Sequence, residues 1–411
     1  MTGSIRPFLD PIMTTARVEL AFDNGETFSE WQSVSLRDTF TDPIGEFSVT
    51  SALTQANGLL KRYRQTLAKG QLVSLKINDI PQFVGLIQTV EKSIGDEGII
   101  FTVSGGTPLV TPYGGAAVED PLDYSKELSF HSENSDVPVA DVLKRIFRPY
   151  FGTDPIIEGD DGQHIDLTSG KKRTKKAAKL TLENLTQRDA IAHPGETAYQ
   201  LASRILTKLG CCLKMRWDGA LLITRPDYDQ EISYTVGQSS REVFPGDRFF
   251  GSVRIKDTNE GQFSEVAVRG TIPDDPESTL ASRPIGVVKS TAINAERPPY
   301  SAASYAAYKP MIIKDKSARD ASRTGSVAKL ALGLPATNAF TVTGMVGGWI
   351  SKSGRVWTPG TLARVVVEMD EIDETMFLLS RTFIQEPDGG QYTQLTFIPK
   401  GYLVLGDLPG D

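Results

Sequence analysis

Five residues belong to the two types that most often act as nucleophiles, general bases or metal ligands. They are His131, His164, His193, Cys211 and Cys212. The histidines lie far apart in expected loops, and neither cysteine lies in a basic motif or at the start of an expected helix, where a thiol pKa would fall. We therefore interpret both cysteines as small apolar strand residues. Because successive strand residues face opposite sides, one thiol is expected in the core and the other at an interface or in solvent.

Acidic side chains form the cluster that most resembles a metal site. The cluster consists of Glu368, Asp370, Glu371, Asp373 and Glu374. It lacks the glycine and the downstream glutamate of an EF-hand loop, and it lies between two expected strands rather than two helices. A solvated hairpin tip is favoured over a calcium site. The chain has no CxxC pair and no HExxH motif, so the sequence predicts no metal.

Glycine and carboxylate pairs carry no recognisable catalytic motif. Pairs such as Gly114-Gly115 match neither GxxxxGK[ST] nor a GxGxxG that opens a helix, and they are typical of bulges and turns in β structure. No GxSxG elbow is present. The pair Asp160-Asp161 has no supporting motif for glycoside hydrolysis. The sequence therefore predicts no enzymatic activity, no catalytic residue and no cofactor.

A basic run lies in the middle of the chain, in a net acidic protein. Its members are Lys171, Lys172, Arg173, Lys175, Lys176 and Lys179. No aromatic residue is interleaved for base stacking, so a solvated loop or a contact with an acidic partner is favoured over nucleic acid or an anionic surface. The whole chain has 44 Lys and Arg against 51 Asp and Glu, a net charge of −7, which argues against a general nucleic-acid binder.

Period-2 patterns dominate residues 16–106. Residues 16–22 alternate apolar and polar side chains, as a half-buried strand does, and Asn24-Gly25 supplies a hairpin turn. Further strand patterns lie at 47–49, 72–77, 83–90 and 99–103, with turn residues at Asn78-Asp79 and Gly95-Asp96. This region is expected to form an antiparallel sheet or barrel.

Helical periods mark the middle of the chain. Apolar residues at 139, 142, 143, 146 and 147 form one stripe, with Asp136 as the expected N-cap, Pro138 in the first turn and Pro149 as the end. Residues 153–191 are polar and aperiodic, typical of a functional loop or a partly disordered segment. A second helix is expected over 198–209, ending at Gly210. A hairpin of strands 211–216 and 220–225 follows.

Strand patterns return from about Phe244, at 251–256 and 263–268. A Ser/Ala/Tyr-rich connection at 297–308 and an expected helix at 315–332 interrupt them. The last block contains four clear strands, at 339–346, 361–369, 375–385 and 391–398, joined by hairpins. The patterns together predict a mainly β, α+β chain in which two β-rich domains flank a smaller α/β module.

Length and composition fit this organisation. The 411 residues allow two to four domains, each with its own core. The adjacent cysteines rule out a disulfide framework. Since neither a secretory signal nor an apolar run long enough to span a bilayer is present, a soluble protein is expected.

Segments in order along the chain resemble one family. They are residues 69–79 (KGQLVSLKIND), 83–87 (FVGLI), 101–105 (FTVSG), 195–198 (GETA), 217–219 (WDG), 225–226 (RP), 354–360 (GRVWTPG) and 388–393 (DGGQYT). Through them the chain resembles the Mu-like bacteriophage baseplate hub protein family, the central tail hub of contractile tails. It departs from the family at 106–112 (GTPLVTP), where an Arg and a polar segment are usual, and residues 153–191 form a longer loop than is usual.

The resemblance implies two tube-like antiparallel β-barrel domains flanking the small α/β module. The implied domains are residues 1–118 (first tube-like β domain), 119–192 (helix and long polar loop), 193–243 (small helix plus hairpin module) and 244–411 (second tube-like β domain). Three chains would then present six similar domains around a channel, an adaptor between a six-fold tail tube and a three-fold central spike.

The resemblance also implies the partners. They are two further copies of the chain in a homotrimer, the central spike protein, a tail tube or distal tube-initiator protein, wedge or other baseplate proteins, and the tape measure protein. DNA would only pass through the channel, whose lining is expected to be acidic so that it repels phosphates. No membrane insertion is implied. The expected location is the tail baseplate of the virion, after assembly in the host cytoplasm.

Two other functions are weighed against a structural hub. A hub-associated cell-wall-degrading enzyme needs a carboxylate or metal site, and the sequence supplies no motif for one. A carbohydrate-binding β protein of a receptor-binding fibre would present clustered aromatic residues, whereas Trp31, Trp217, Trp349 and Trp357 are scattered.

Overall fold

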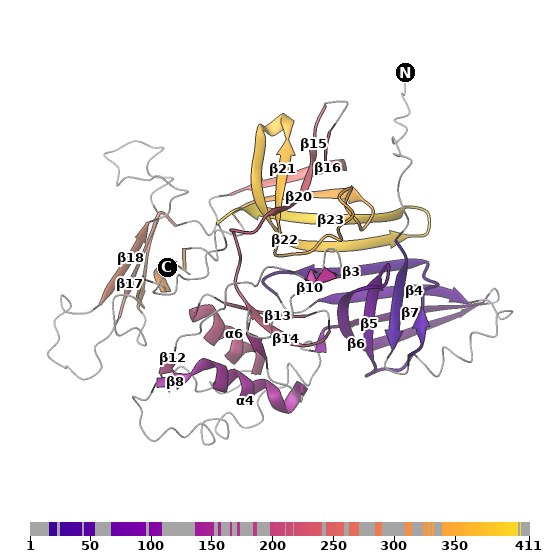
Figure 1. Ribbon diagram of the computed structural model, residues 1–411, viewed down its shortest axis with the longest axis horizontal. Helices are drawn as coiled ribbons and strands as arrows, with labels where there is room; N and C mark the ends of the chain where they lie inside the picture. The colour runs from indigo at the N-terminus through magenta and orange to yellow at the C-terminus, as the bar shows by residue number, and fades with distance from the viewer. Residues whose placement is uncertain are drawn as a thin grey trace.

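The computed structural model of the chain (Figure 1) covers the regions that contain most of the predicted elements. The structure describes residues 16–22, 25–42, 45–53, 67–95, 98–108, 136–151, 155–157, 165–166, 171–172, 184–186, 198–209, 211–216, 218–240, 244–258, 263–270, 284–289, 309–314, 324–325, 327–329, 331–332, 339–401 and 403.

Seven described strands form the N-terminal sheet. They are β1 (Val18–Phe22), β2 (Thr27–Phe28), β3 (Ser33–Thr39), β4 (Glu46–Leu53), β5 (Leu72–Ile77), β6 (Ile80–Gly95) and β7 (Gly98–Gly106). All neighbours are antiparallel, in the order β2-β1-β5-β6-β7-β4-β3. The predicted strands of this region are confirmed, and β3 is an additional strand. Alternation buries one side of each strand, for example Val18, Leu20 and Phe22 of β1.

The turn between β5 and β6 fixes the register of the N-terminal sheet. Asn78 and Asp79 adopt positive φ angles of 47° and 65°, as a two-residue hairpin loop requires. Asn78 also holds β1, because its Oδ1 accepts from Arg17 N at 2.8 Å and its N–H donates to the Arg17 carbonyl at 2.9 Å. Within the described residues no pairing joins β1 or β2 to β3, so the pairings leave this sheet open. The antiparallel sheet that the residue patterns allowed is present, and the barrel that the resemblance implied for this region is not confirmed.

Six strands close into the C-terminal barrel. They are β15 (Ile232–Gln238), β16 (Asp247–Asp257), β20 (Phe340–Gly347), β21 (Leu362–Val367), β22 (Ile372–Glu386) and β23 (Gly390–Pro399). Their order is β22-β21-β15-β16-β20-β23, and pairing of β23 with β22 closes the ring. The four strands predicted in the last block are confirmed.

The prediction of a purely antiparallel barrel is wrong at β15, which pairs in parallel with both β16 and β21. The parallel overlap of β15 with β16 is short, because only Val236 and Gly237 pair with the first two residues of β16. The connection 239–246 therefore does not have to carry the chain back along the whole of β15, as a full parallel crossover would. β15 itself lies within the stretch 193–243 that was expected to form the helix-and-hairpin module.

Strand β22 joins the barrel to the N-terminal sheet. Along one edge it pairs with β23, and along the other it pairs first with β21, through residues 372–377, and then with β3, through residues 380–385. The two halves therefore share one continuous sheet of thirteen strands. In Figure 1 the barrel strands lie directly above the N-terminal strands.

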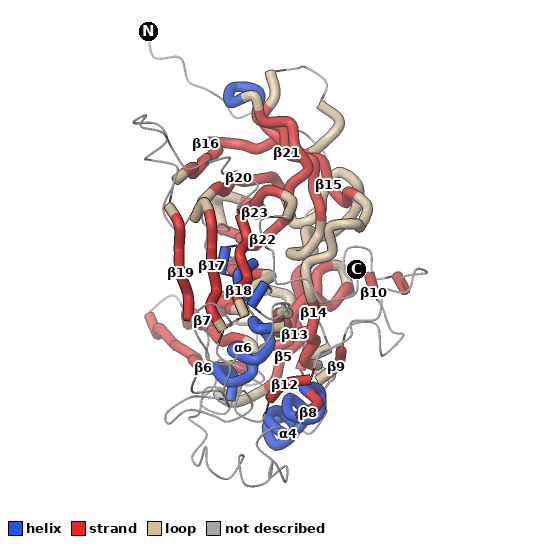
Figure 2. Tube along the Cα trace, turned by 90° about the vertical axis from the view of Figure 1, so that its left-hand side faces the viewer, coloured by secondary structure: helices blue, strands red, loops and turns tan. Residues whose placement is uncertain are grey.

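Two helices and short strands form a separate layer, which Figure 2 shows at the opposite end of the molecule from β16 and β21. The layer contains β8 (Asp136–Pro138), α4 (Val139–Phe151), β9 (Ile156–Ile157), β12 (Asn184–Thr186), α6 (Ala198–Lys208), β13 (Cys212–Met215) and β14 (Leu221–Thr224). Between β9 and β12 in sequence, β10 (Ile165–Asp166) and β11 (Lys171–Lys172) form a two-stranded sheet of their own, away from the helices. Both predicted apolar stripes are buried against each other, and the predicted hairpin forms between β13 and β14. None of the described helices is long and apolar enough to cross a membrane.

Three predictions for this layer are corrected. Asp136 belongs to β8, which pairs with β12, so it is not the N-cap of a helix. Helix α4 continues past Pro149 to Phe151, so the predicted end at Pro149 is wrong by two residues. Proline removes one hydrogen bond and crowds the carbonyl four residues before it, and this disruption falls in the last turn, where few helical hydrogen bonds remain to be lost. Residues 153–191, predicted to be aperiodic, contribute four short strands, β9 to β12. The predicted end at Gly210 lies outside the described residues.

A second, smaller sheet stands apart from the barrel. It contains β17 (Glu265–Arg269), β18 (Ile285–Lys289) and β19 (Pro310–Lys314), in the order β18-β17-β19. Helical residues within 324–332 cover one face, where Ala328 packs on Val266 and Val268. The approach is close at Gly286, where any Cβ atom would overlap the backbone of Thr324. The strand predicted at 263–268 therefore belongs to this sheet, and most of the predicted helix 315–332 and all of 297–308 lie outside the described residues.

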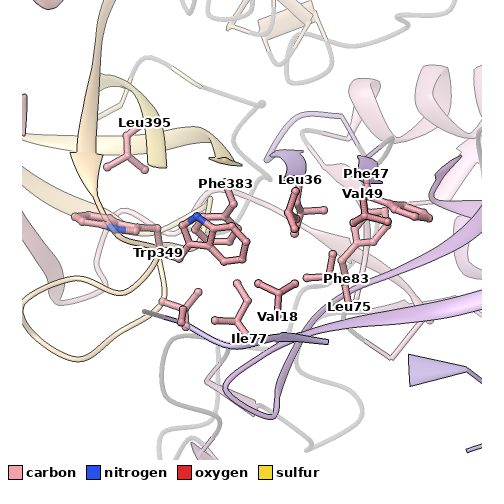
Figure 3. Packing of buried hydrophobic residues seen from close by; sticks show 14 of the residues in the cluster. Val18, Leu36, Phe47, Val49, Leu75, Ile77, Phe83, Trp349, Phe383 and Leu395 are labelled. Carbon is pink, nitrogen blue, oxygen red and sulfur yellow. The ribbon is translucent and has the colours of Figure 1, made fainter. Parts of the chain in front are cut away.

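The main hydrophobic core runs without a break from the N-terminal sheet into the barrel. Figure 3 shows Leu36 and Val18 of the N-terminal sheet in one layer with Phe383 and Trp349 of the barrel side. The rings of Trp349 and Phe383 stack with centroids 5.2 Å apart. Since this core is shared, the free energy of burial holds the two halves in a fixed relation.

Candidate functional site

The histidines and cysteines do not form a site in the described residues. His131, His164 and His193 lie outside them. Cys211 packs among the apolar residues of α4 and α6, whereas Cys212 faces the barrel side and packs in a different cluster. Burial raises the pKa of Cys212 to about 12, so at neutral pH it is a thiol and a poor nucleophile.

The acidic cluster lies in the turn between β21 and β22, which includes the 3₁₀ helix η3 (Glu368–Asp370). Glu368 Oε2 accepts from the N–H and the hydroxyl of Ser240, at 2.7 Å each, and its Oε1 accepts from the Ser239 hydroxyl. Asp373 makes two 2.7 Å bonds to Arg364. Among the described residues no three His, Cys, Asp or Glu side chains are placed to hold a metal ion.

The basic run is only partly described. Lys171 and Lys172 form β11, and Lys171 lies opposite Asp166 of β10. The other four basic residues of the run lie outside the described residues, as does Trp217. Preference for an acidic partner over nucleic acid therefore stays a prediction.

A small cavity lies between the N-terminal sheet and β13. Its lining includes Gln82, Val84, Thr107, Lys214 and Arg216, and its empty volume is about 280 Å³, part of it open solvent. Pockets for small ligands are usually larger and mostly enclosed. The cavity therefore offers no binding site for a cofactor or a drug-sized substrate.

The most deeply buried charged side chain of the described residues is Arg381, which is 2% exposed. It lies on β22 two residues before the buried Phe383, after a bulge between Leu378 and Ser380. Arg381 and Phe383 therefore share a face of the strand, and the Arg381 side chain points into the main core. Burial lowers the pKa of this guanidinium below its ordinary value, and the nearby Asp38 carboxylate opposes that shift. Arginine keeps its charge at physiological pH, so the core must supply partners for a cation.

Those partners come from both halves of the molecule. From the N-terminal sheet, Gln82 Oε1 accepts from Arg381 Nη1 at 3.0 Å, and Asp38 Oδ2 lies 3.5 Å from Nη2. From the barrel side, the Trp357 carbonyl accepts a short hydrogen bond from Nη1, and the Phe383 ring lies 4.6 Å from the guanidinium carbon. One cation thus connects β3, β6, β22 and the loop before β21.

The loop that supplies the Trp357 carbonyl is held rigidly. The ring of Trp357 packs on Tyr234 with centroids 4.4 Å apart. The Tyr234 hydroxyl donates to the Val356 carbonyl at 2.6 Å and accepts from Thr358 N at 3.1 Å. Burial raises the pKa of Tyr234 well above its usual value, so the hydroxyl keeps the proton that it donates.

A chain of amide hydrogen bonds forms a second junction at the open edge of the N-terminal sheet. Gln391 of β23 accepts from Ala16 N and donates to the Ala16 carbonyl, both at 2.7 Å. It also donates to Gln385 at 3.0 Å, and Gln385 donates to the Trp31 carbonyl at 3.1 Å. In a closed barrel the backbone groups of Ala16 and Trp31 would form hydrogen bonds with a neighbouring strand. Here the side-chain amides of Gln391 and Gln385 bind them instead. We call this chain the amide seam.

A third junction ties the helical layer to both β regions. Phe40 packs edge-on against Phe377 at 5.0 Å, in a cluster that includes Cys212 and Leu403. Lys214 of β13 donates to the Pro359 carbonyl at 3.2 Å and lies 5.5 Å from the centre of the Phe40 ring. The three regions therefore meet at one point.

The junction at Arg381 and the amide seam were not predicted from the sequence. One signal was available for Arg381, because a charged residue two positions before Phe383 on an apolar strand shares its buried face and requires buried partners. Gln391 had no comparable signal, since glutamine is common on exposed hairpins. Both groups hold parts of the molecule together, and neither offers a reacting centre to a substrate.

Comparisons with known proteins give the fold. Residues 336–400 match the family model described as tail protein, C-terminal domain. The chain is similar to the tail protein from Neisseria meningitidis MC58, with a TM-score of 0.66, 16% identity and coverage of 95% of this chain and 98% of that one. No curated protein sequence matches the chain.

A second solved structure agrees with the first. The prophage MuSo2 43 kDa tail protein from Shewanella oneidensis gives a TM-score of 0.64 and 16% identity, and covers 95% of this chain and 100% of that one. The chain therefore shares the fold of these two tail proteins over nearly its whole length. At this identity the likeness establishes fold alone.

Proposed function

We propose that this chain is the structural baseplate hub of a phage tail or a related contractile injection machine. The observation that carries the proposal is the fold shared with two phage tail proteins over 95% of the chain. The match of residues 336–400 to a tail-protein C-terminal domain supports it independently of the fold comparison. The role is structural rather than enzymatic.

The internal architecture supports an adaptor. The closed six-stranded barrel and the seven-stranded N-terminal sheet are joined through strand β22 and share one hydrophobic core. We retain the four-part domain division as part of the proposal, with β15 counted in the barrel. Two β units of similar size in each chain would let a homotrimer present six units to a tail tube and three-fold symmetry to a central spike.

The proposed surroundings follow from that role. The partners are two further copies of the chain, the spike protein, a tube or tube-initiator protein, wedge or other baseplate proteins and the tape measure protein. DNA passes through the acidic lumen without a specific site. The chain acts in the tail baseplate of the virion, after assembly in the host cytoplasm.

A cryo-EM map of the intact particle tests the proposal. The expected map contains three copies of the chain around the channel, between tube and spike, with the β units in pseudo-six-fold positions. A map with the chain on a peripheral fibre, or in another copy number, would contradict it. Light scattering on the purified chain, alone and mixed with its spike protein, gives an independent mass, and a monomer in both samples would contradict the trimer.

A further inference from the structure

The free face of the β17–β19 sheet carries an apolar row. Register places Val287, Ala267 and Ile312 side by side across the three strands. Val287 is 51% exposed and Ile312 is 69% exposed, although both are large apolar side chains. The opposite face is already covered by the helical residues 324–332, so this row belongs to a face that nothing in the described chain covers.

Charged residues flank the row on the same face. One flanking row contains Ile285, Arg269 and Lys314, and the other contains Lys289, Glu265 and Pro310. Three cations against one carboxylate give this small face a net positive charge. An apolar centre with a basic rim is suited to a partner that has an exposed apolar side chain among carboxylates.

The turn between β21 and β22 presents the features that such a partner needs, an exposed apolar side chain among carboxylates. Met369 is 90% exposed at its tip, between Glu368 and Asp370, and Glu371 follows. The turn is already rigid, because Glu368 is bonded to Ser239 and Ser240, and Glu371 N–H donates to the Glu368 carbonyl at 3.3 Å. A preorganised turn loses little conformational entropy when it binds.

The two surfaces belong to different parts of the same chain. Figure 1 shows β17 and β18 at one side of the molecule and β21 elsewhere, in the barrel, and Figure 2 agrees. Both members of the complementary pair are present on every copy, so a second copy can supply the turn that the sheet face lacks. A contact between unlike surfaces of identical chains produces a ring when the rotation closes.

We propose that the Met369 turn of one chain docks on the β17–β19 face of a second copy. Met369 packs on the row of Val287, Ala267 and Ile312, while Asp370 and Glu371 face the basic rim. The inference rests on the proposed function, which requires a ring of identical chains, and it names one of the contacts that would build that ring.

Sedimentation velocity of the purified full-length chain over a concentration series tests the contact. Ile312→Asp is expected to weaken self-association by at least about tenfold, because it places a carboxylate in the apolar row opposite an acidic turn. The matched control is Ile94→Asp, since Ile94 is 73% exposed on the distant β6–β7 hairpin. The control is expected to associate like the wild type, and equal effects of the two variants would overturn the proposal.

Charge reversal provides a test that misfolding cannot imitate. Lys314→Glu and Asp370→Lys are each expected to weaken association, and more so at low salt than at high salt. Both changes in one chain are expected to restore association, because the reversed charges again attract. A double variant weaker than either single variant would overturn the contact.

Disulfide trapping locates the contact directly. A chain carrying Ile312→Cys and Met369→Cys is expected to form an interchain disulfide on mild oxidation, while the native Cys211 and Cys212 stay buried and unreactive. Self-association without this crosslink would contradict the proposed contact but leave the proposed hub untouched. A wild-type chain that stays monomeric also overturns it, and the particle map then still tests the proposed hub independently.

Discussion

The barrel and the N-terminal sheet differ in how the strands at their edges find hydrogen-bond partners. The barrel pairs β23 with β22 and closes by backbone hydrogen bonds. The N-terminal sheet leaves β1 and β3 unpaired with each other in the described residues, and Gln391 of the barrel binds the backbone just before β1. The closed unit is complete in itself, whereas the open one depends on its neighbour.

This difference predicts that the N-terminal sheet is stable only while it is attached to the barrel. Strand β22 gives the attachment its backbone pairing, Arg381 gives it a buried cation, and the amide seam gives it side-chain hydrogen bonds. Removal of each component should affect the open unit more than the closed one.

The largest effect is expected from Arg381→Met. The substitution leaves Gln82, Asp38 and the Trp357 carbonyl without the cation that they bind, and the loss of one partner from a buried charged network costs about 3 kcal/mol of unfolding free energy. Urea denaturation should show this loss, with the N-terminal sheet unfolding before the barrel.

Arg364→Met is the matched control for that experiment. Arg364 also binds a carboxylate, through two bonds to Asp373, but both side chains are 52% exposed. Exposed ion pairs contribute little to stability, so the control should unfold like the wild type. Equal losses in the two variants would show that burial of Arg381 is not what matters.

A pair of glycine substitutions compares the two units directly. A Cβ atom at Gly237 of β15 would overlap the Val366 carbonyl, and one at Gly105 of β7 would overlap the Leu86 carbonyl. A closed ring cannot widen to relieve the overlap, whereas an open sheet can. Gly237→Ala is therefore expected to cost about 3 kcal/mol and Gly105→Ala about 1–2 kcal/mol. Thermal unfolding measures both.

Gly95→Ala is the control for steric overlap. Gly95 lies at the end of β6, and a Cβ atom there meets nothing within 4 Å. It should leave the unfolding temperature unchanged. A larger loss at Gly105 than at Gly237 would argue against the idea that closure makes the barrel the less adaptable unit.

Protonation of Asp247 should affect the barrel alone. Asp247 begins β16, is 8% exposed and accepts from Lys352 N with both oxygens at 3.1 Å. Burial raises its pKa from 3.8 to about 6, so between these values the folded chain holds a proton that the unfolded chain has lost. The stability due to this proton is complete below about pH 4 and disappears as pH rises through about 6.

Asp247→Asn removes this dependence. At pH 7.5 the variant should be more stable than the wild type by about 1–2 kcal/mol, and near pH 4 the two should be equal. Denaturation across the pH range measures the difference. The same difference at both ends of the range would assign the effect to packing rather than to charge.

The smallest effect is expected from Gln391→Ala. Loss of the two bonds to Ala16 should cost about 1 kcal/mol and speed amide exchange in β1, while the barrel keeps its protection. Gln394→Ala is the control, because Gln394 lies on the same strand with an exposed side chain. Hydrogen exchange measured by mass spectrometry compares them. If amide exchange at residues 16–22 were unchanged, the amide seam would not be what protects the open edge of the N-terminal sheet.

Local pattern was sufficient for most elements and insufficient for their connections. The strand patterns at 16–22, 72–77 and in the last block predicted strands because burial alternates along a single strand. The helix at 139–147 was predicted because its apolar residues recur with the period of a helix, although its continuation past Pro149 was not predicted. β15 was overlooked, although Tyr234 and Val236 alternate with polar residues, because the expected module boundary lay beyond it.

The residues at the junctions were harder to find than the strands. Arg381 gave a weak signal through its phase with Phe383, but its partners Asp38 and Gln82 lie 343 and 299 residues away in sequence. Nothing local distinguishes either partner from a surface residue. The complementary pair formed by the β17–β19 face and the Met369 turn also required the register of three strands before it could be recognised.

The sequence by itself determined the mainly β character of the chain, the positions of the helices and hairpins and the absence of a recognisable catalytic motif. These properties depend on residues close together along the chain, where side-chain periodicity and turn chemistry act. The tertiary structure alone decided that one unit closes and the other stays open, that β15 runs parallel to its neighbours, and that a buried arginine joins the two. Such properties depend on pairings and contacts that turn patterns do not encode, among them β3 with β22 and β15 with β21, which are far apart in sequence and form only once the chain has folded.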